Sequence, residues 1–136
     1  MNFLTKSDFD TARENARPYV HHTPIFHSST LSDITGSKVF LKAEMFQKAG
    51  SYKVRGPLNV LAHMPEEARE RGIICSSAGN HAQGVARAAK EYGVKSMVVM
   101  PHGSPETKIN ATRSYGAEVV LHGNIWDDAY KHSLQL

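Results

Sequence analysis

Lys53 is the residue of this sequence whose surroundings point most clearly to covalent chemistry. It lies in the segment GSYKVRG, residues 50–56, between an aromatic and a β-branched residue. Partial removal from water by these two neighbours would favour the neutral amine, which is the form that imine chemistry requires. Most protein lysines are solvated cations, so an exposed lysine at the start of a helix is the alternative interpretation.

A second polar cluster, SSAGNH at residues 76–81, directly follows the apolar run at residues 73–75. If that run is a parallel strand, the cluster lies outside its carboxyl end, where ligands gather and helix N-termini present free N–H groups. Gly79 allows close approach of the backbone, and the side chains of Ser77 and Asn80 are available to an anion. The cluster is a candidate carboxylate or phosphate site, although such residues also serve simply as helix caps.

The eight histidines and the single cysteine give no comparable signal. No two histidines are spaced i, i+4 with a carboxylate between them, so we expect no metal site and interpret His21 and His22 as a surface pair. Cys75 follows two isoleucines and is interpreted as a small core residue rather than a nucleophile. A lone cysteine excludes an intrachain disulfide and favours a reducing compartment, so we predict a cytoplasmic protein.

The elements that position these groups follow from the hydrophobic pattern. Three apolar runs typical of buried strands alternate with three segments of helical spacing: residues 73–75, 80–92, 97–100, 105–115, 119–121 and 125–136. Gly93 and Gly116 are typical stop signals for the first two helices. This alternation predicts an α/β fold with an open, twisted, parallel sheet and helices on both of its faces.

The N-terminal part is less regular. We expect a helix over residues 8–17, with Ser7 as its cap and Pro18 as its stop. An irregular stretch, a strand, a polar loop and a helix follow, at residues 21–30, 38–43, 47–51 and 54–64. Pro57 is tolerated in the first turn of the last helix.

The composition is that of a soluble globular protein. The 136 residues are 40% hydrophobic and 21% charged, which excludes disordered, collagen-like and membrane classes. The net charge of +3 is not concentrated in a basic run, so we expect no nucleic-acid partner. The first thirty residues contain acidic side chains and lack an apolar run, so we expect no signal peptide and no membrane partner.

Together these motifs resemble the threonine dehydratase and serine dehydratase and racemase family, which belongs to the tryptophan-synthase-β-like (fold type II) enzymes that depend on pyridoxal 5'-phosphate. The segment at residues 50–56 resembles the signature around the cofactor lysine of that family. Other segments resemble the family in order and spacing and extend the match over essentially the whole chain: Thr23-Pro24, residues 41–44, Gln47, residues 76–84, 99–101 and 111–120.

The resemblance implies roles for particular residues. Lys53 matches the lysine that forms the Schiff base with the cofactor, and Asn80 matches the asparagine that contacts the cofactor 3-hydroxyl group. The loop that cradles the substrate carboxylate is matched by Ser77, Ala78, Gly79, Asn80 and His81. Tyr52 replaces a usual phenylalanine and Pro57 a common alanine, and neither change removes a functional group.

The implied activity is a β-elimination that converts L-threonine to 2-oxobutanoate, or L-serine to pyruvate, with release of ammonia. Racemases of the family carry a catalytic serine at the position of Ala78, and alanine cannot transfer a proton. A dehydratase is therefore favoured over a serine racemase, which is the first alternative. A non-catalytic fragment that folds or associates is the alternative from a different class.

The resemblance also implies that this chain corresponds to the N-terminal portion of a longer family enzyme, because the family's glycine-rich phosphate loop has no counterpart in this sequence. Residues 1–50 would be an arm with the start of the large domain, and residues 51–136 a small α/β domain, incomplete at its C-terminus, of a parent that forms a homo-oligomer. Nucleotide-activated members bind AMP or ATP near a subunit interface through residues that match Lys48, Gln83 and Tyr115. These three are the expected effector residues.

Overall fold

The larger sheet of the molecule is three-stranded and parallel. The structure is a computed structural model that describes residues 3–136. The strands follow one another in the order β3-β4-β5: Ile73–Ser76, Ser96–Met100 and Glu118–Leu121. Cys75 lies opposite Val98, which in turn lies opposite Val119. The predicted open parallel α/β sheet is confirmed, and its strands fall within one residue of the expected runs.

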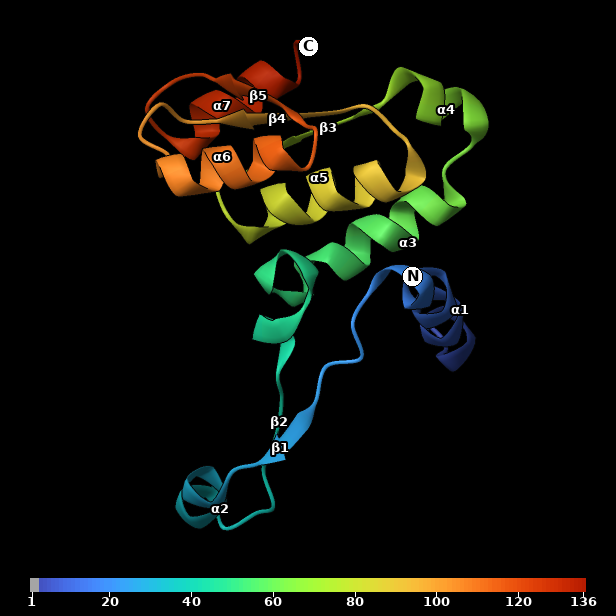
Figure 1. Ribbon diagram of the computed structural model, residues 1–136, viewed down its shortest axis with the longest axis vertical. Coiled ribbons are helices and arrows are strands. Elements are labelled where there is room, and N and C mark those ends of the chain that lie inside the picture. The colour runs from blue at the N-terminus through green and yellow to red at the C-terminus, as the bar shows by residue number, and fades with distance from the viewer. Residues whose placement is uncertain (1–2) are drawn as a thin grey trace.

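Helices cover both faces of this sheet, as predicted (Figure 1). Helices α5 (Asn80–Tyr92) and α6 (Glu106–Ser114) pack on one face, and α7 (Trp126–Ser133) contacts β3 and β4 from the other. The alanines of α5 allow this helix to approach its neighbours closely. Helix α5 ends where Gly93 adopts the left-handed conformation at φ 63°, which confirms the predicted stop.

Two further helices attach the N-terminal part to α5. Helix α1 (Lys6–Ala16) packs on α3 (Arg55–His63), and α3 packs on α5. The predicted Ser7 cap is wrong, because Thr5 and Asp8 form a reciprocal capping box that starts the helix two residues earlier. A short helix, α4 (Glu66–Arg71), was not expected, since its sequence EEARER has no apolar periodicity.

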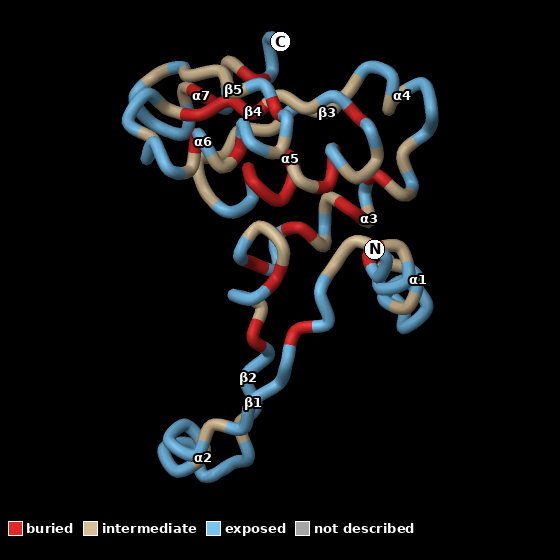
Figure 2. The backbone as a smooth tube through the Cα atoms, viewed as in Figure 1, coloured by how far each residue is buried: buried red, intermediate tan, exposed pale blue. Residues whose placement is uncertain are grey.

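Two buried clusters form the core. One joins α1, α3 and α5: Ala16, Val54, Leu58, Leu61, Ala88, Ala89 and Val94. The other lies between α5, α6 and the sheet: Ala82, Ala86, Val98, Met100, Ile109 and Ala117. Figure 2 shows buried backbone concentrated in these elements. Val54 belongs to the first cluster, so the residue next to Lys53 is anchored in the core.

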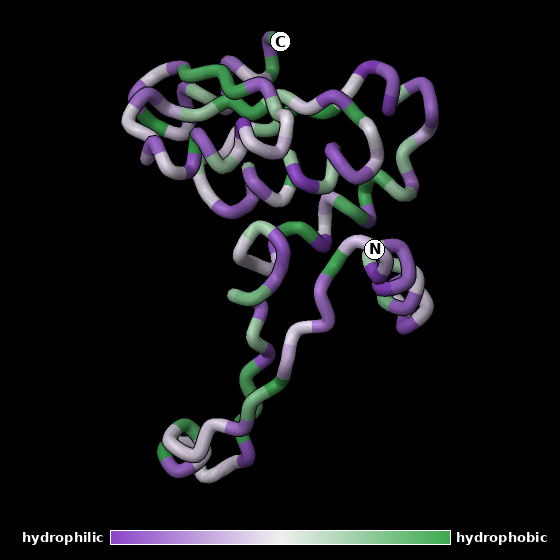
Figure 3. Tube along the Cα trace, in the orientation of Figure 1, coloured by the Kyte–Doolittle hydropathy of each residue, from purple (hydrophilic) through white to green (hydrophobic). Residues whose placement is uncertain are grey.

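The β1–β2 segment, residues 24–43, extends away from the sheet (Figure 1). It contains β1 (Ile25–His27), α2 (Ser29–Thr35) and β2 (Phe40–Lys42), and the two strands pair antiparallel. The expectation of an irregular stretch at 21–30 is wrong, because it includes β1 and the start of α2. Comparison of Figures 2 and 3 shows that hydrophobic stretches of these strands are exposed.

Three short 3-10 turns lead from the β1–β2 segment to α3: η2 (Glu44–Phe46), η3 (Lys48–Gly50) and η4 (Tyr52–Val54). The polar loop expected at residues 47–51 contains η3, in which Ala49 has a left-handed backbone at φ 60°. One more such turn, η1 (Arg17–Tyr19), follows α1 and contains Pro18. Within residues 3–136, no helix has the length and apolar character needed to span a membrane.

Candidate functional site

Lys53 lies in η4, immediately before α3. The Lys53 backbone N–H donates a hydrogen bond of 3.3 Å to the Ser51 hydroxyl. Val54, which is 1% exposed, fixes the other side of the turn. The expected shielding of Lys53 by both neighbours is wrong in this structure. Val54 is turned into the core, Tyr52 is 58% exposed, and the lysine side chain is exposed with its amine 5.3 Å from the Tyr52 ring centre.

The backbone of Lys53 packs directly on α5 at Gly84. A Cβ atom at this glycine would lie 2.5 Å from the Lys53 carbonyl oxygen, a distance that real structures do not permit. The glycine therefore allows the turn and the helix to touch. Gly84 lies one helical turn after the N-terminus of α5, and the 76–81 cluster ends at that N-terminus. The contact therefore places the Lys53 backbone one turn from the cluster.

His81 provides electrostatic evidence that Lys53 is close to this cluster. Partial burial and then the positive charge of Lys53 lower the pKa of the His81 imidazole. The neutral imidazole is consequently favoured at neutral pH. Lys53 and His81, which are far apart along the chain, therefore lie close enough for the charge of one to act on the other.

The loop from β3 to α5 leaves the helix N-terminus open. Ser77 N–H donates to the Val99 carbonyl at 3.2 Å, and Gly79 N–H donates to the Ser77 hydroxyl at 3.3 Å. Gly79 is the N-cap residue, and no side chain among residues 3–136 caps α5. The first N–H groups of the helix thus lack side-chain acceptors, which suits an anion and argues against the capping interpretation.

Asn80, the first residue of α5, is held by a residue that sequence reasoning missed. Lys108 of α6 donates from its Nζ to the Asn80 Oδ1 atom at 2.8 Å. Both side chains reach the same end of the loop, because α5 and α6 pack side by side (Figure 1). The site therefore contains a second ammonium group in addition to Lys53.

Trp126, also missed from the sequence, holds the end of β3. Its indole N–H donates to the Ser76 carbonyl at 3.0 Å, and its ring stacks on Tyr130. The backbone N–H groups of Ile73 and Ser77 donate to the carbonyls of Lys95, just before β4, and of Val99 in β4, so by strand alternation the Ser76 carbonyl points away from β4. Trp126 satisfies a carbonyl that the sheet itself leaves free.

A polar joint connects the β1–β2 segment to the turn that carries Lys53. Arg55 binds Glu44 through two hydrogen bonds of 2.8 and 2.9 Å, and the buried Thr23 hydroxyl donates to Glu44 at 2.6 Å. The Arg55 hydrogen bond is the main reason that the pKa of Glu44 falls to about 2. We name Thr23, Glu44 and Arg55 the polar joint.

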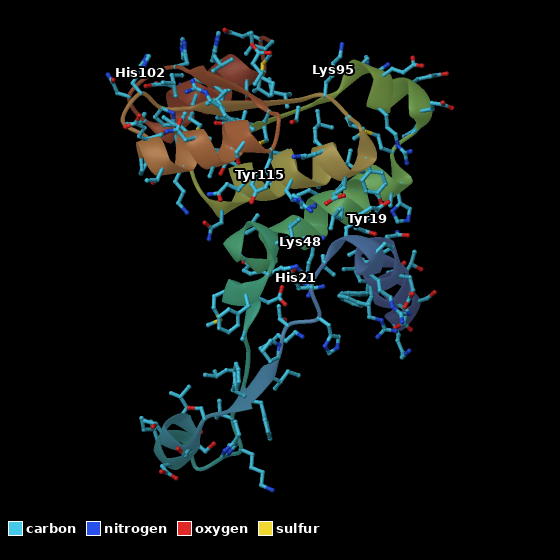
Figure 4. All side chains as sticks on the ribbon, in the orientation of Figure 1. Tyr19, His21, Lys48, Lys95, His102 and Tyr115 are labelled. Carbon is cyan, nitrogen blue, oxygen red and sulfur yellow. The ribbon has the colours of Figure 1, made fainter. Side chains whose placement is uncertain are left out.

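The Gln47 side chain reinforces this junction. It accepts hydrogen bonds from the N–H groups of His21 and Lys48 and donates to the His21 carbonyl. Figure 4 shows His21 and Lys48 near each other where the β1–β2 segment meets the helices. Gln47 is buried, so both chain segments are fixed at this point.

The three expected effector residues gather around α5 without forming one bonded cluster. Lys48 lies in η3, which packs on α5; Gln83 lies on α5 itself and is 8% exposed. Tyr115, labelled in Figure 4, follows α6, and the guanidinium carbon of Arg87 lies 5.8 Å from the centre of its ring. Among residues 3–136, no hydrogen bond joins any two of the three.

Other groups lie outside this site. Burial raises the pKa of the Cys75 thiol to about 11, so the thiol stays protonated at neutral pH and fits the core interpretation. A hollow of about 910 Å³ lies between α1 and the polar joint, where Glu44, Tyr52 and Arg55 contribute to its lining, and that lining contains neither Lys53 nor the 76–81 loop. No group of three or more potential metal ligands occurs among residues 3–136.

Comparison with known proteins covers nearly the whole chain. Residues 16–136 match the family model described as pyridoxal-phosphate dependent enzyme. The L-threonine ammonia-lyase of Thermotoga maritima is 47% identical over 133 residues, which are 98% of this chain and 33% of that protein. The chain thus spans about a third of the length of this curated relative.

Solved structures with the same arrangement include a racemase and a deaminase. The serine racemase of Dictyostelium discoideum superposes with a TM-score of 0.88 at 33% identity, over 97% of this chain and 43% of that one. The threonine deaminase isoform 2 of Solanum lycopersicum gives a TM-score of 0.81 at 32% identity, over 97% and 40%. Both likenesses extend over nearly the whole of this chain.

Proposed function

Because this chain belongs to the family of pyridoxal-phosphate dependent enzymes, we propose that it forms the lysine-bearing portion of a lyase acting on hydroxylated amino acids. The substrates are L-threonine and L-serine, and the products are the 2-oxo acid and ammonia. One observation carries the proposal: the close contact of the Lys53 backbone with Gly84 holds the lysine-bearing turn against α5, one helical turn from its uncapped end.

The side chains present fit this cofactor. Lys53 offers an exposed amine, the Asn80 amide offers N–H donors, and the open end of α5 offers backbone N–H groups. When bound, pyridoxal phosphate supplies an electron-accepting ring. A phosphorylated aldehyde that acts on an amino-acid substrate requires an amine, a neutral hydrogen-bond donor and an anion site.

Each part of the chain would then have a separate task. The Lys53 amine would hold the cofactor, and its Nζ atom would accept the proton that leaves the substrate carbon. The N–H groups of the loop from Ser77 to His81 bind the substrate carboxylate, and the helix N-terminus stabilises its charge. The Gly84 contact and the polar joint keep the Lys53 turn fixed during these events.

Ala78 favours the lyase over a racemase. A racemase needs a second proton-transferring group on the face opposite Lys53, and the methyl group of Ala78 transfers no proton. The similarity to serine racemase structures makes racemisation the second candidate, because the backbone alone does not distinguish the two reactions. Formation of D-serine by a protein containing this chain would favour that candidate.

The remaining expectations belong to the same proposal. We infer an AMP or ATP site near Lys48, Gln83 and Tyr115, which all lie around α5. Residues 1–50 and 51–136 are proposed as parts of a large and a small domain in a homo-oligomeric, cytoplasmic parent protein. Packing of η3 and α6 on α5 would let a nucleotide act on the helix that presents Asn80.

The test is to mix the purified chain with pyridoxal phosphate, reduce it with borohydride and map the modified lysine by mass spectrometry. We expect preferential labelling of Lys53, together with a visible absorption band that a Lys53→Ala variant loses. Lys38→Ala, which removes an exposed lysine outside the site, is the matched control and should retain the band. Labelling spread evenly over many lysines would contradict the proposal for this chain.

A further inference from the structure

The contact between Lys108 and Asn80 determines which atoms Asn80 can offer to a ligand. An ammonium group only donates hydrogen bonds, and an amide has one oxygen and one NH₂ group. Since Lys108 Nζ lies 2.8 Å from Oδ1, the oxygen is occupied and the NH₂ group is turned elsewhere. The lysine thereby selects one of the two orientations of this amide.

Lys108 is well placed to hold this orientation. Its backbone N–H donates to the Pro105 carbonyl at 2.9 Å, and its carbonyl accepts from the Thr112 hydroxyl at 2.8 Å. Thr112 is fully buried. Ile109, which directly follows Lys108 in the sequence, packs in the core beside Ala82 of α5. The backbone that carries the Lys108 side chain is thus held by hydrogen bonds and by the packing of its neighbours in the core.

The charge of Lys108 is not neutralised by a carboxylate. Among residues 3–136, no acidic side chain forms an ion pair with it, and the 76–81 cluster contains no acidic residue. The turn that carries Lys53 contacts α5 at Gly84, one helical turn from Asn80, and the Lys53 charge helps to lower the pKa of His81. Anionic oxygen is therefore the complementary ligand chemistry.

We propose that Lys108 is a positioning residue that orients Asn80 so that its amide N–H groups donate to an anionic oxygen of the ligand bound at the loop. This inference rests on the proposed function, in which that ligand is pyridoxal phosphate. Without Lys108 the amide rotates freely, and half of its orientations present an oxygen to an oxygen. Lys108 acts through Asn80 and need not touch the ligand.

The first measurement uses the chain without cofactor. In spectra of the ¹⁵N-labelled protein, the side-chain NH₂ signals of Asn80 are identified by their loss in Asn80→Asp. We expect Lys108→Met to shift these signals and Lys108→Arg, which keeps a donor-only cation, to preserve them. Lys90→Met, at the other end of α5, is the control and should change nothing. Unchanged Asn80 signals in Lys108→Met would overturn the proposal.

The second measurement titrates the same variants with pyridoxal phosphate and follows the absorption band. Loss of one charge-assisted hydrogen bond predicts an affinity about tenfold weaker in Lys108→Met and near the original value in Lys108→Arg. An altered amide signal with unaltered affinity would also overturn it, because the contact would then only support the fold. If the original chain gives no band at all, the proposed function fails for this chain, and the amide spectra still decide whether Lys108 orients Asn80.

Discussion

The sheet with its helices and the β1–β2 segment bury their apolar side chains to very different extents. Leu58, between α1, α3 and α5, is 0% exposed, whereas Leu41 of β2 is 46% exposed. All residues of both core clusters lie outside the β1–β2 segment. Lys53 lies at the boundary of these two regions, so its position depends on the packed core on one side and on the polar joint on the other.

This contrast separates two kinds of stabilisation. The core side is held by hydrophobic burial, which is insensitive to pH, and the other side by a charged hydrogen-bonded group. Changes on the two sides should therefore differ in size and in pH dependence.

A matched pair of leucine substitutions tests the difference in burial between the two regions and should give the largest effect. Leu58→Ala creates a cavity in the core, and we expect the free energy of unfolding to fall by about 3 kcal/mol. Leu41→Ala removes a side chain that is already half-exposed, so we expect a loss below about 1 kcal/mol. Urea unfolding followed by circular dichroism measures both. Equal losses would show that the β1–β2 segment is buried in solution.

The contact at Gly84 should give the next largest effect. Gly84→Ala places a methyl group 2.5 Å from the Lys53 carbonyl oxygen, and backbone atoms on both sides must move. We expect a loss of about 2 kcal/mol in the free energy of unfolding, together with weaker labelling of Lys53 by pyridoxal phosphate. Gly56→Ala is the control, because a Cβ atom there meets nothing within 4 Å. Normal labelling of Gly84→Ala would rule out this contact as what positions Lys53.

The polar joint should show a smaller loss than the Gly84 contact, together with a distinctive pH dependence. The pKa of Glu44 is lowered from 4.5 to about 2, so its ionised form stabilises the fold above pH 4.5. This contribution is lost as the pH falls from 4.5 to 2. Glu44→Gln should lower the free energy of unfolding at pH 7 by about 1 kcal/mol, since the pair is partly exposed.

The control for this change is the pH profile itself. In Glu44→Gln the decline between pH 4.5 and 2 should be shallower than in the original chain, when unfolding is measured at fixed ionic strength. Parallel profiles would mean that other carboxylates, such as Asp8 with its capping-box bonds, account for the acid sensitivity.

The two regions also differ in how far their folds were predictable from sequence. The sheet was predicted because each strand and helix between residues 73 and 136 carries its own periodicity, and because Gly93 and Gly116 mark the ends of two of the helices. Strand β1 has only three residues, and its side chains remain exposed, so no alternation of buried and exposed positions marks it.

The same reasoning explains which residues of the candidate site could be selected from the sequence. Lys53 and the 76–81 cluster are recognisable locally, because residue type and neighbours suffice to select them. Lys108 and Trp126 are not, since they act on residues 28 and 50 positions away in the sequence. Their roles arise only when α6 and α7 pack beside the loop, and an isolated lysine or tryptophan in a helix gives no sign of this. The shielding expected around Lys53 failed for a similar reason: Tyr52 turns outward.

Trp126 also gives this molecule an internal optical reporter. It is the only tryptophan of the chain, and its indole N–H is bonded to the carbonyl that begins the candidate ligand loop. Indole emission depends on hydrogen bonding and on nearby absorbing groups, so a chromophoric ligand arriving at the loop should quench or shift it. The chain can thus signal occupation of its own site by fluorescence, without an attached dye or a catalytic turnover.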